Sequence, residues 1–367
     1  MLSRRINKIE ESGIRKIFAL AAEGGDFVNL SIGQPHFKAP AVIKEAAIKA
    51  ILLDRNSYTQ TAGLPDLRER IAERLCVKNG IKASSAEVII TSGVSAALFL
   101  LFASIIDEGD EIILADPYFV LYKQLIDFLG GRVVLLDTYP TFHLDAKKLP
   151  NLITSRTKAI IVNSPNNPTG AVYGRDELAA IADVARANNL LIISDEIYES
   201  FDYEKKFTSI GSIYEKTVTL NGFSKSHAVT GWRVGFAHGP AEIIEAMNRL
   251  QQYTFVCAPA PFQTALSQEL NADIGDFVAA YRHNRDYLYA ELKDYYELNV
   301  PEGAFYAFLR SPQGRTDFVN ELIENNLLAV PGEVFSGRTD YFRLSFAVSK
   351  EVLMKGVAIL KRLARNK

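Results

Sequence analysis

The sequence is poor in cysteine and has almost no excess of charge of either sign. Its 367 residues include two cysteines, and 41 lysines and arginines stand against 43 aspartates and glutamates, a formal net charge of −2. Cys76 and Cys257 form neither a CxxC pair nor a Cys/His cluster, so we expect no disulfide framework and no metal site, as in a reducing cytoplasm. Near neutrality excludes a general electrostatic grip on nucleic acid or an anionic membrane.

Long hydrophobic runs are also missing. The longest strongly apolar stretch, residues 96–106, covers about half of the ~20 residues that a membrane-spanning helix needs. Residues 1–12 alternate charged and apolar side chains, which argues against a signal peptide. We therefore expect a cytoplasmic protein with no membrane partner, and its length predicts about two domains.

Short apolar runs alternate with helical stretches through the middle of the chain. The predicted strands cover residues 88–91, 111–115, 132–136, 159–163, 190–194, 218–221 and 234–237. Apolar residues recur at helical spacing in residues 95–106, 122–129, 175–187 and 240–252. Continuously apolar strands separated by helices predict an α/β fold with a mostly parallel, seven-stranded sheet between helices. In such sheets, ligands bind at the carboxyl ends of the strands.

The two ends of the chain depart from this alternation. The elements predicted there are helices at residues 14–22, 274–296 and 350–364 and extended segments at 28–32, 304–309, 327–330 and 341–346. We therefore expect a large domain at residues 38–275 and a small α+β domain formed jointly by residues 1–37 and 276–367.

Three segments that follow predicted strands carry residues able to bind a ligand. Residues 91–95 (TSGVS) form a glycine-containing turn, which either seats a phosphate on helix N–H groups or simply holds a serine N-cap. Residues 164–170 (SPNNPTG) form a rigid turn that fixes an asparagine amide or is a plain turn. In residues 194–198 (SDEIY), the acidic group at the strand end either meets a positive partner or caps the next turn.

Two further segments carry cations. Lys225 lies in a loop shared with Arg233, where a lowered pKa would make it an amine nucleophile, although most lysines are solvated surface charges. Arg343 interrupts an alternating strand and either faces inward to bind a carboxylate or forms a salt bridge. A lysine amine, a carboxylate, a phosphate seat and an asparagine–tyrosine pair are together what pyridoxal 5′-phosphate requires.

At these residues the chain resembles the class I/II aminotransferases of the aspartate aminotransferase fold family, which has fold type I and uses pyridoxal 5′-phosphate. The ordered set SPNNPTG, SDEIY, SKSHAVTGWRVG and FRLSF is similar to that family's pattern, including the eight-residue spacing of Lys225 and Arg233. The similarity extends from about residue 12 to the C-terminal helix. It implies a homodimer that exchanges an amino group between an L-amino acid and a 2-oxo acid such as 2-oxoglutarate.

The resemblance also implies roles for individual residues. Lys225 would form the Schiff base with the cofactor and then move the proton, Asp195 would pair with the pyridine nitrogen, and Tyr198 would contact the ring oxygen. The other residues implied in cofactor binding are Asn167 at the same oxygen, Phe119 (or Tyr118) on the ring face, and Gly93, Val94, Ser95, Ser224, Arg233 and the partner subunit's Tyr58 at the phosphate. The residues implied for the substrate carboxylate are Gly33, Asn167 and Arg343.

Two alternatives stay open. One is another enzyme on the same scaffold, such as a carbon–sulfur lyase or a cyclopropane-forming synthase. The other is a non-catalytic effector-binding domain of a transcription regulator, although only about a dozen residues precede the first matched segment. Residues 12–18 (SGIRKIF) and the aromatic content most resemble the branch that handles aspartate and aromatic amino acids, and no second arginine can be assigned to a side-chain carboxylate.

Overall fold

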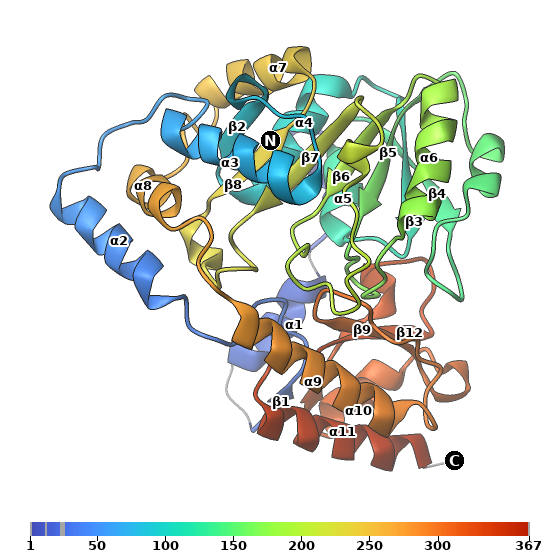
Figure 1. Ribbon diagram of the computed structural model, residues 1–367. Coiled ribbons are helices and arrows are strands. Elements are labelled where there is room, and N and C mark those ends of the chain that lie inside the picture. Colours follow the sequence, from blue (N-terminus) through green and yellow to red (C-terminus); the bar gives the residue numbers. More distant parts are fainter. Residues whose placement is uncertain (1, 12, 23–25, 366–367) are drawn as a thin grey trace.

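A seven-stranded sheet forms the centre of the larger part of the protein. The computed structural model describes residues 2–11, 13–22 and 26–365 (Figure 1). The sheet contains β2 (Val88–Thr91), β3 (Glu111–Asp116), β4 (Arg132–Asp137), β5 (Thr157–Asn163), β6 (Leu191–Asp195), β7 (Thr217–Gly222) and β8 (Gly235–His238). The strand order is β2-β8-β7-β6-β5-β3-β4, and β8 alone is antiparallel to its neighbours. The predicted α/β fold with a mostly parallel seven-stranded sheet is confirmed.

The reversed strand β8 decides which residues meet at the carboxyl edge of the sheet. Gly235, the first residue of β8, pairs with Thr91 at the end of β2 and with Gly222 at the end of β7. The segment that precedes β8 therefore lies at the same edge as the segments that follow the other six strands. Arg233, two residues before β8, reaches the ligand-binding edge for this reason.

Helices cover both faces of the sheet because its strands bury alternate side chains in opposite directions. Ile161 of β5 packs with α4 (Gly93–Ile105), α5 (Val120–Phe128) and α7 (Ala241–Gln252), whereas Ile160 and Val162 pack with α6 (Arg175–Ala187). The helices α2 (Ala41–Leu52), α3 (Pro65–Asn79) and α8 (Ala260–Gln268) add a further apolar cluster beside β2 and β8. No helix in the described part of the chain is long and apolar enough to cross a membrane.

The two ends of the chain come together below the large sheet (Figure 1). The elements there are α1 (Gly13–Ala22), β1 (Val28–Asn29), α9 (Gly275–Leu292), β9 (Tyr306–Arg310), α10 (Phe318–Glu324), β10 (Leu327–Leu328), β11 (Val330–Pro331), β12 (Tyr341–Ser345) and α11 (Lys350–Arg365). Strand β1 pairs with β10, and β11, β12 and β9 form an antiparallel sheet. The domain boundaries near residues 38 and 275 stay a prediction.

The segment predicted as one strand at residues 327–330 is divided in two. Its first half pairs with β1 from the N-terminal part of the chain, and its second half pairs with β12.

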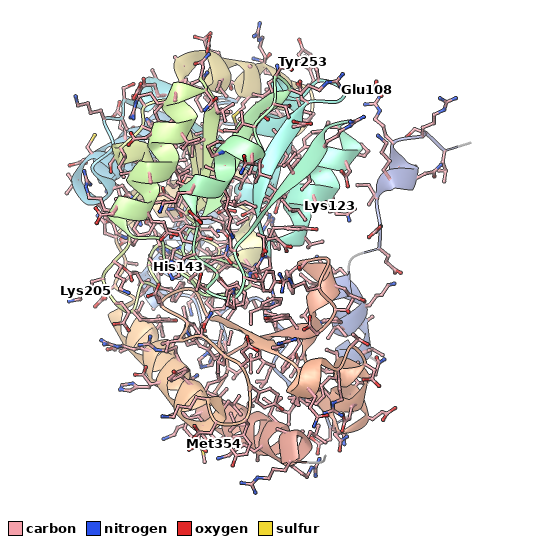
Figure 2. All side chains as sticks on the ribbon, turned by 90° about the vertical axis from the view of Figure 1, so that its right-hand side faces the viewer. Glu108, Lys123, His143, Lys205, Tyr253 and Met354 are labelled. Atoms are coloured by element: carbon pink, nitrogen blue, oxygen red, sulfur yellow. The ribbon has the colours of Figure 1, made fainter. Side chains whose placement is uncertain are left out.

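His143, labelled in Figure 2, lies where the large and small parts meet. Its Nδ1 is 3.1 Å from Glu177 of α6, and its Nε2 is 3.7 Å from Glu302 ahead of β9. The hydrogen bond to Glu177 raises the pKa of His143, so lower pH strengthens this junction.

Candidate active site

A cavity of about 1630 Å³ lies at the carboxyl edge of the large sheet and extends to the small part of the protein. The sequence-predicted residues that line it are Gly33, Val94, Ser95, Phe119, Asn167, Asp195, Tyr198, Ser224, Lys225, Arg233 and Arg343, with Tyr118 beside them. Gly93 lies directly behind this wall against Arg233. The structure thus gathers segments that are up to 310 residues apart, from Gly33 to Arg343, around one space.

Lys225 extends into this cavity from the loop after β7. Its Nζ donates a hydrogen bond to the backbone oxygen of Gly33 at 2.7 Å. Withdrawal from water, with Arg343 and Arg233 nearby, lowers the pKa of Lys225 to about 8, against an opposing pull from Asp195. A lysine with this pKa keeps a larger neutral fraction near neutral pH than a solvated one, and an amine nucleophile requires the neutral form.

Asp195 is the buried carboxylate of the cavity. Its Oδ2 accepts a hydrogen bond from the hydroxyl of Tyr122 at 2.6 Å, and its Oδ1 accepts from the N–H of Ile197 at 3.2 Å. Burial raises the pKa of Asp195 in spite of these bonds and of Lys225. Asp195 therefore caps its own turn, as one alternative predicted, and also offers its carboxylate to a positively charged group in the cavity.

Tyr122 is a functional residue that the sequence analysis missed. It lies in the first turn of α5, and its ring meets the edge of Phe119 with centroids 5.6 Å apart. Its position after the end of β3 was the available signal, because that helix start lies at the ligand-binding edge. Tyr122 connects the predicted ring-stacking residue with the predicted carboxylate partner.

Tyr122→Phe is expected to move the acid limb of the pH dependence of kcat upward by about one pH unit. The hydroxyl of Tyr122 lowers the pKa of Asp195 by bonding to its charged form. Removing that bond favours the protonated acid, so the ionised carboxylate is lost at a higher pH. Tyr214→Phe, which deletes a hydroxyl bonded to the backbone oxygen of Leu190, serves as the control. An unchanged acid limb in Tyr122→Phe would contradict this role.

The start of α4 and Arg233 together form a seat for an anion. Gly93 has φ +76°, and a Cβ there would lie 2.5 Å from Nη2 of Arg233, so only glycine allows this approach. Arg233 donates through Nη1 to the backbone oxygen of Thr230 at 2.9 Å and through Nη2 to that of Ser92 at 3.3 Å. The side chain of Ser92 makes no capping bond. The helix N-terminus and the guanidinium thus favour an anion at this point.

Arg343 on β12 also lines the cavity and is only 1% exposed. It donates through Nη1 to Oδ1 of Asn167 at 3.1 Å and through Nη2 to the backbone oxygen of Ser31 at 2.9 Å, while its buried Nε has no acceptor. The described residues offer it no carboxylate within ion-pair distance, so the salt-bridge alternative does not hold there. A buried guanidinium without a carboxylate partner favours the binding of an anionic ligand.

Asn167 and Tyr198 are held in place by residues that the sequence did not single out. Asn163, at the end of β5, accepts the backbone N–H of Asn167 at 2.9 Å. The hydroxyl of Tyr198 lies 2.9 Å from the hydroxyl of Tyr306, whose ring lies 4.4 Å from the guanidinium of Arg343. A Cβ on Gly33 would lie 2.8 Å from the hydroxyl of Tyr306, so a larger residue there would displace this hydroxyl.

Two of the sequence predictions are not tested by a single chain and stay predictions: the role of Tyr58 at the phosphate of the partner subunit, and the substrate branch inferred from residues 12–18. Tyr58 is 85% exposed and does not line the cavity of its own chain. Ser12, the first residue of the segment used to infer the substrate branch, lies outside the described residues, whereas Ile14, Lys16 and Ile17 of that segment line the cavity.

Comparison with known families agrees with this geometry. Residues 25–360 match the family model of aminotransferase class I and II. The chain belongs to the class I and II aminotransferase family. It is therefore an aminotransferase, and the family resemblance predicted from the motifs is confirmed.

Individual members of the family are similar to this aminotransferase along nearly their whole length. The aspartate/prephenate aminotransferase of Thermus thermophilus is 39% identical and aligns over 99% of this chain and 98% of its own. The aspartate aminotransferase of Thermotoga maritima is 35% identical over 97% of both chains. The solved structure of the Thermus thermophilus aspartate aminotransferase with maleate gives a TM-score of 0.94 at 38% identity, covering 100% of this chain and 99% of that one. The fold of the aspartate aminotransferases is thereby shown.

Proposed function

We propose that this aminotransferase exchanges the amino group between an L-amino acid, aspartate or an aromatic amino acid, and a 2-oxo acid such as 2-oxoglutarate, with pyridoxal 5′-phosphate as cofactor. The observation that carries the proposal is one cavity that holds Lys225 with a lowered pKa, the buried carboxylate of Asp195 and the buried, unpaired guanidinium of Arg343. These three groups match an amine nucleophile, a partner for a ring cation and a receptor for a carboxylate.

The residues present fit the cofactor. The start of α4 and the guanidinium of Arg233, which packs directly against Gly93, provide a seat for its phosphate, and Val94, Ser95 and Ser224 line the same cavity. Asp195 would hold its pyridine nitrogen, with Asn167 and Tyr198 at the ring oxygen and Phe119 on the ring face. When bound, the cofactor supplies an electron sink for the bond to the substrate Cα.

The chain's own residues would divide the remaining work between binding and proton transfer. Arg343 would bind the α-carboxylate of the substrate and so fix the position of its Cα. The Nζ of Lys225 would then take the proton from that carbon and return it at the other end of the exchange. Tyr122 would keep Asp195 ionised throughout, since its hydrogen bond favours the charged carboxylate.

The walls of the cavity support a substrate with either an aromatic or an acidic side chain. Ile14 and Ile17 provide apolar surface, and Lys16 provides a positive charge in the same cavity lining. The names of similar proteins include both classes: aspartate/prephenate in Thermus thermophilus and, for a structure with TM-score 0.89 and 34% identity, an aromatic aminotransferase of Pyrococcus horikoshii.

A panel of amino donors against 2-oxoglutarate tests the substrate proposal. We expect aspartate and phenylalanine each to give a kcat/KM at least about tenfold above that of alanine, because a single misplaced methylene or charge in such a pocket costs a factor of this order. Glutamate formation measures the exchange for every donor. Activity with alanine alone would contradict the proposed substrate class while leaving the aminotransferase activity intact.

We also propose that the active enzyme is a homodimer. Large apolar side chains are exposed on two segments of the large part. They are Val42, Ile48, Ile51, Leu52 and Leu53 on and after α2, followed by Tyr58, and Tyr253, Phe255 and Val256 after α7. Figure 1 shows α2 standing out from the rest of the large part, and Figure 2 shows Tyr253 pointing outward. A second copy would cover this surface and bring its Tyr58 to the cavity. Light scattering at twice the mass of one chain would support this arrangement, and a monomer of full activity would contradict it.

A further inference from the structure

The turn that follows β6 presents its side chains to two different sides of the protein. Asp195 and Tyr198 line the catalytic cavity. The carboxylates of Glu196 and Glu199 instead bond to Asn79 of α3. The backbone N–H of Glu199 donates to the oxygen of Glu196 at 2.9 Å, which makes the turn tight. A displacement of the glutamates would therefore displace the two cavity residues as well.

Glu199 is the charged member of this pair. Its side chain is only 3% exposed, and it forms ion pairs with Arg74 and with Lys78, the latter at 3.3 Å. It also accepts a hydrogen bond from Nδ2 of Asn79 at 2.7 Å. Together the cations and the amide lower the pKa of Glu199 although burial acts in the opposite direction. The buried carboxylate of Glu199 thus holds the turn against α3, because a buried charge is destabilising when its ion-pair partners are removed.

Glu196 is held by neutral groups. It accepts hydrogen bonds from the hydroxyls of Ser194 at 2.8 Å and Ser209 at 2.5 Å, and from Asn79 at 3.3 Å. Among the described residues it has no cation within ion-pair distance, and burial together with Glu199 raises its pKa to about 8. Glu196 therefore adds hydrogen bonds without a second charge at neutral pH, so the anchoring charge of the turn is that of Glu199.

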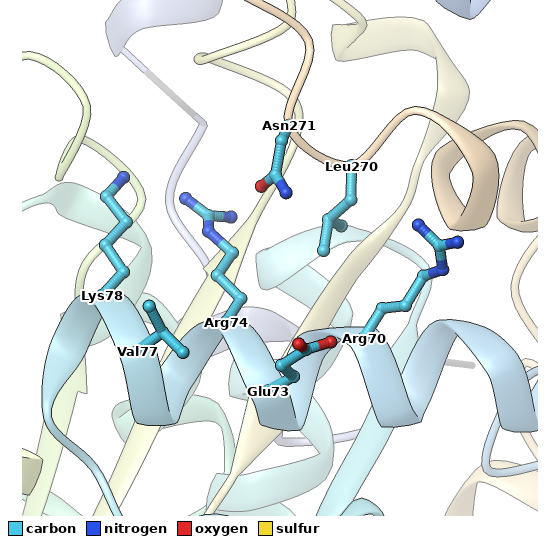
Figure 3. Close-up of a pocket in the computed structure, with 7 residues that line it drawn as sticks. All are labelled: Arg70, Glu73, Arg74, Val77, Lys78, Leu270 and Asn271. Atoms are coloured by element: carbon cyan, nitrogen blue, oxygen red, sulfur yellow. The ribbon is translucent and has the colours of Figure 1, made fainter.

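Helix α3, which carries Arg74, Lys78 and Asn79, is itself packed firmly against the large sheet. Its side chains Leu67, Ile71 and Leu75 are buried in the apolar cluster beside β2 and β8. Figure 3 shows Arg74 and Lys78 on the same side of the helix, beside a pocket of about 210 Å³ that Leu270 and Asn271 close from above. Arg74 is 12% exposed there, so it is packed as well as paired.

We propose that Arg74, Asn79 and Glu199 are positioning residues, which fix the turn after β6 so that Asp195 and Tyr198 keep their places relative to Lys225. This inference rests on the proposed function of the cavity. It assigns a role to a cluster that lies outside the cavity and touches no substrate or cofactor. The role follows from the shared turn: Glu199 is the direct neighbour of Tyr198, and the ring of Tyr198 lies 6.0 Å from Nζ of Lys225.

The variants Glu199→Gln and Arg74→Gln, loaded with pyridoxal phosphate, test this role. We expect kcat to fall about tenfold or more with a smaller change in KM, because small displacements of catalytic groups act on the reaction step. The pH at which the absorbance of the lysine-bound cofactor changes is expected to shift by about half a unit. A shift is expected because Asp195 acts electrostatically on the site of Lys225, and displacing its carboxylate changes that interaction. The dissociation constant of pyridoxal phosphate is expected to rise in both variants.

Two further variants separate positioning from stability. Arg74→Lys keeps a cation and is expected to recover part of the kcat that Arg74→Gln loses. The comparison of these two Arg74 variants tests the role even if Glu199→Gln does not fold. Glu321→Gln removes an ion pair of 2.6 Å to Arg315 in the small part of the protein and is expected to change the melting temperature alone. If Arg74→Gln or Glu199→Gln lowers only the melting temperature, the positioning role is wrong. If the wild type itself shows no lysine-bound cofactor, the proposed function is wrong, and the positioning role that rests on it is wrong as well.

Discussion

Lys225→Ala is expected to abolish the absorbance of the lysine-bound cofactor and to lower transamination by about 10⁴-fold or more. The variant loses the amine that bonds to the cofactor and the base that moves the substrate proton, and a positioned base alone contributes up to this factor. Lys225 lines the cavity together with Asp195 and Arg343, and its Nζ donates a hydrogen bond to the backbone oxygen of Gly33 at 2.7 Å. Spectral titration with pyridoxal phosphate and a glutamate assay measure the two effects.

Lys361→Ala is the matched control for this experiment. Its ammonium group lies 2.7 Å from Glu291 in the small part of the protein, well away from the cavity lining. It is expected to keep the absorbance and the turnover of the wild type. Normal transamination by Lys225→Ala would show that the amine of Lys225 does not carry the reaction.

Arg343→Lys is expected to reduce kcat/KM for the amino donor by about hundredfold, which corresponds to about 3 kcal/mol. The planar guanidinium bonds through two nitrogens to Asn167 and Ser31 and keeps Nε without an acceptor, and a lysine cannot reproduce this fork. The loss is expected mainly in KM, because the carboxylate is bound before and during the reaction. Initial rates over a range of donor concentrations measure it.

The affinity for pyridoxal phosphate distinguishes this effect from general damage to the site. We expect it to change less than the donor KM, since in the described part of the chain Arg343 makes no hydrogen bond to the anion seat formed by the start of α4 and Arg233. Arg338→Lys, at a guanidinium that packs on the exposed side of Tyr139, is the control and keeps its KM. An unchanged donor KM in Arg343→Lys would remove Arg343 from substrate binding.

The sequence predicted the strands well because burial on both faces leaves a clear apolar signature. The strand expected at residues 88–91 has these same bounds, and the one expected at 159–163 starts two residues earlier. The reversed direction of β8 left no comparable signal, since its side chains are equally buried in either direction. The same holds for α2 and α3, whose packing on other helices was not predicted.

Part of the site could not be predicted, because it depends on contacts between side chains that are far apart in the sequence. Motifs identified Asp195 because it ends a buried strand, and Lys225 because it shares a loop with Arg233. Tyr122 and Tyr306 carry no such anomaly, since tyrosines at a helix start or in a strand are ordinary. Their importance arises from hydroxyls that meet Asp195 and Tyr198 at 2.6 Å and 2.9 Å. Backbone oxygens such as that of Gly33 leave no sequence signal at all.

The half-reaction in the absence of a 2-oxo acid tests the central claim most directly. The enzyme loaded with pyridoxal phosphate is mixed with an excess of aspartate, and the oxo acid and ammonia released are both quantified. An aminotransferase built on Lys225, Asp195 and Arg343 is expected to form about one oxo acid per active site, to release no ammonia, and to resume turnover when 2-oxoglutarate is added. Continuous release of ammonia, or of far more than one oxo acid per active site, without added 2-oxoglutarate would contradict the account.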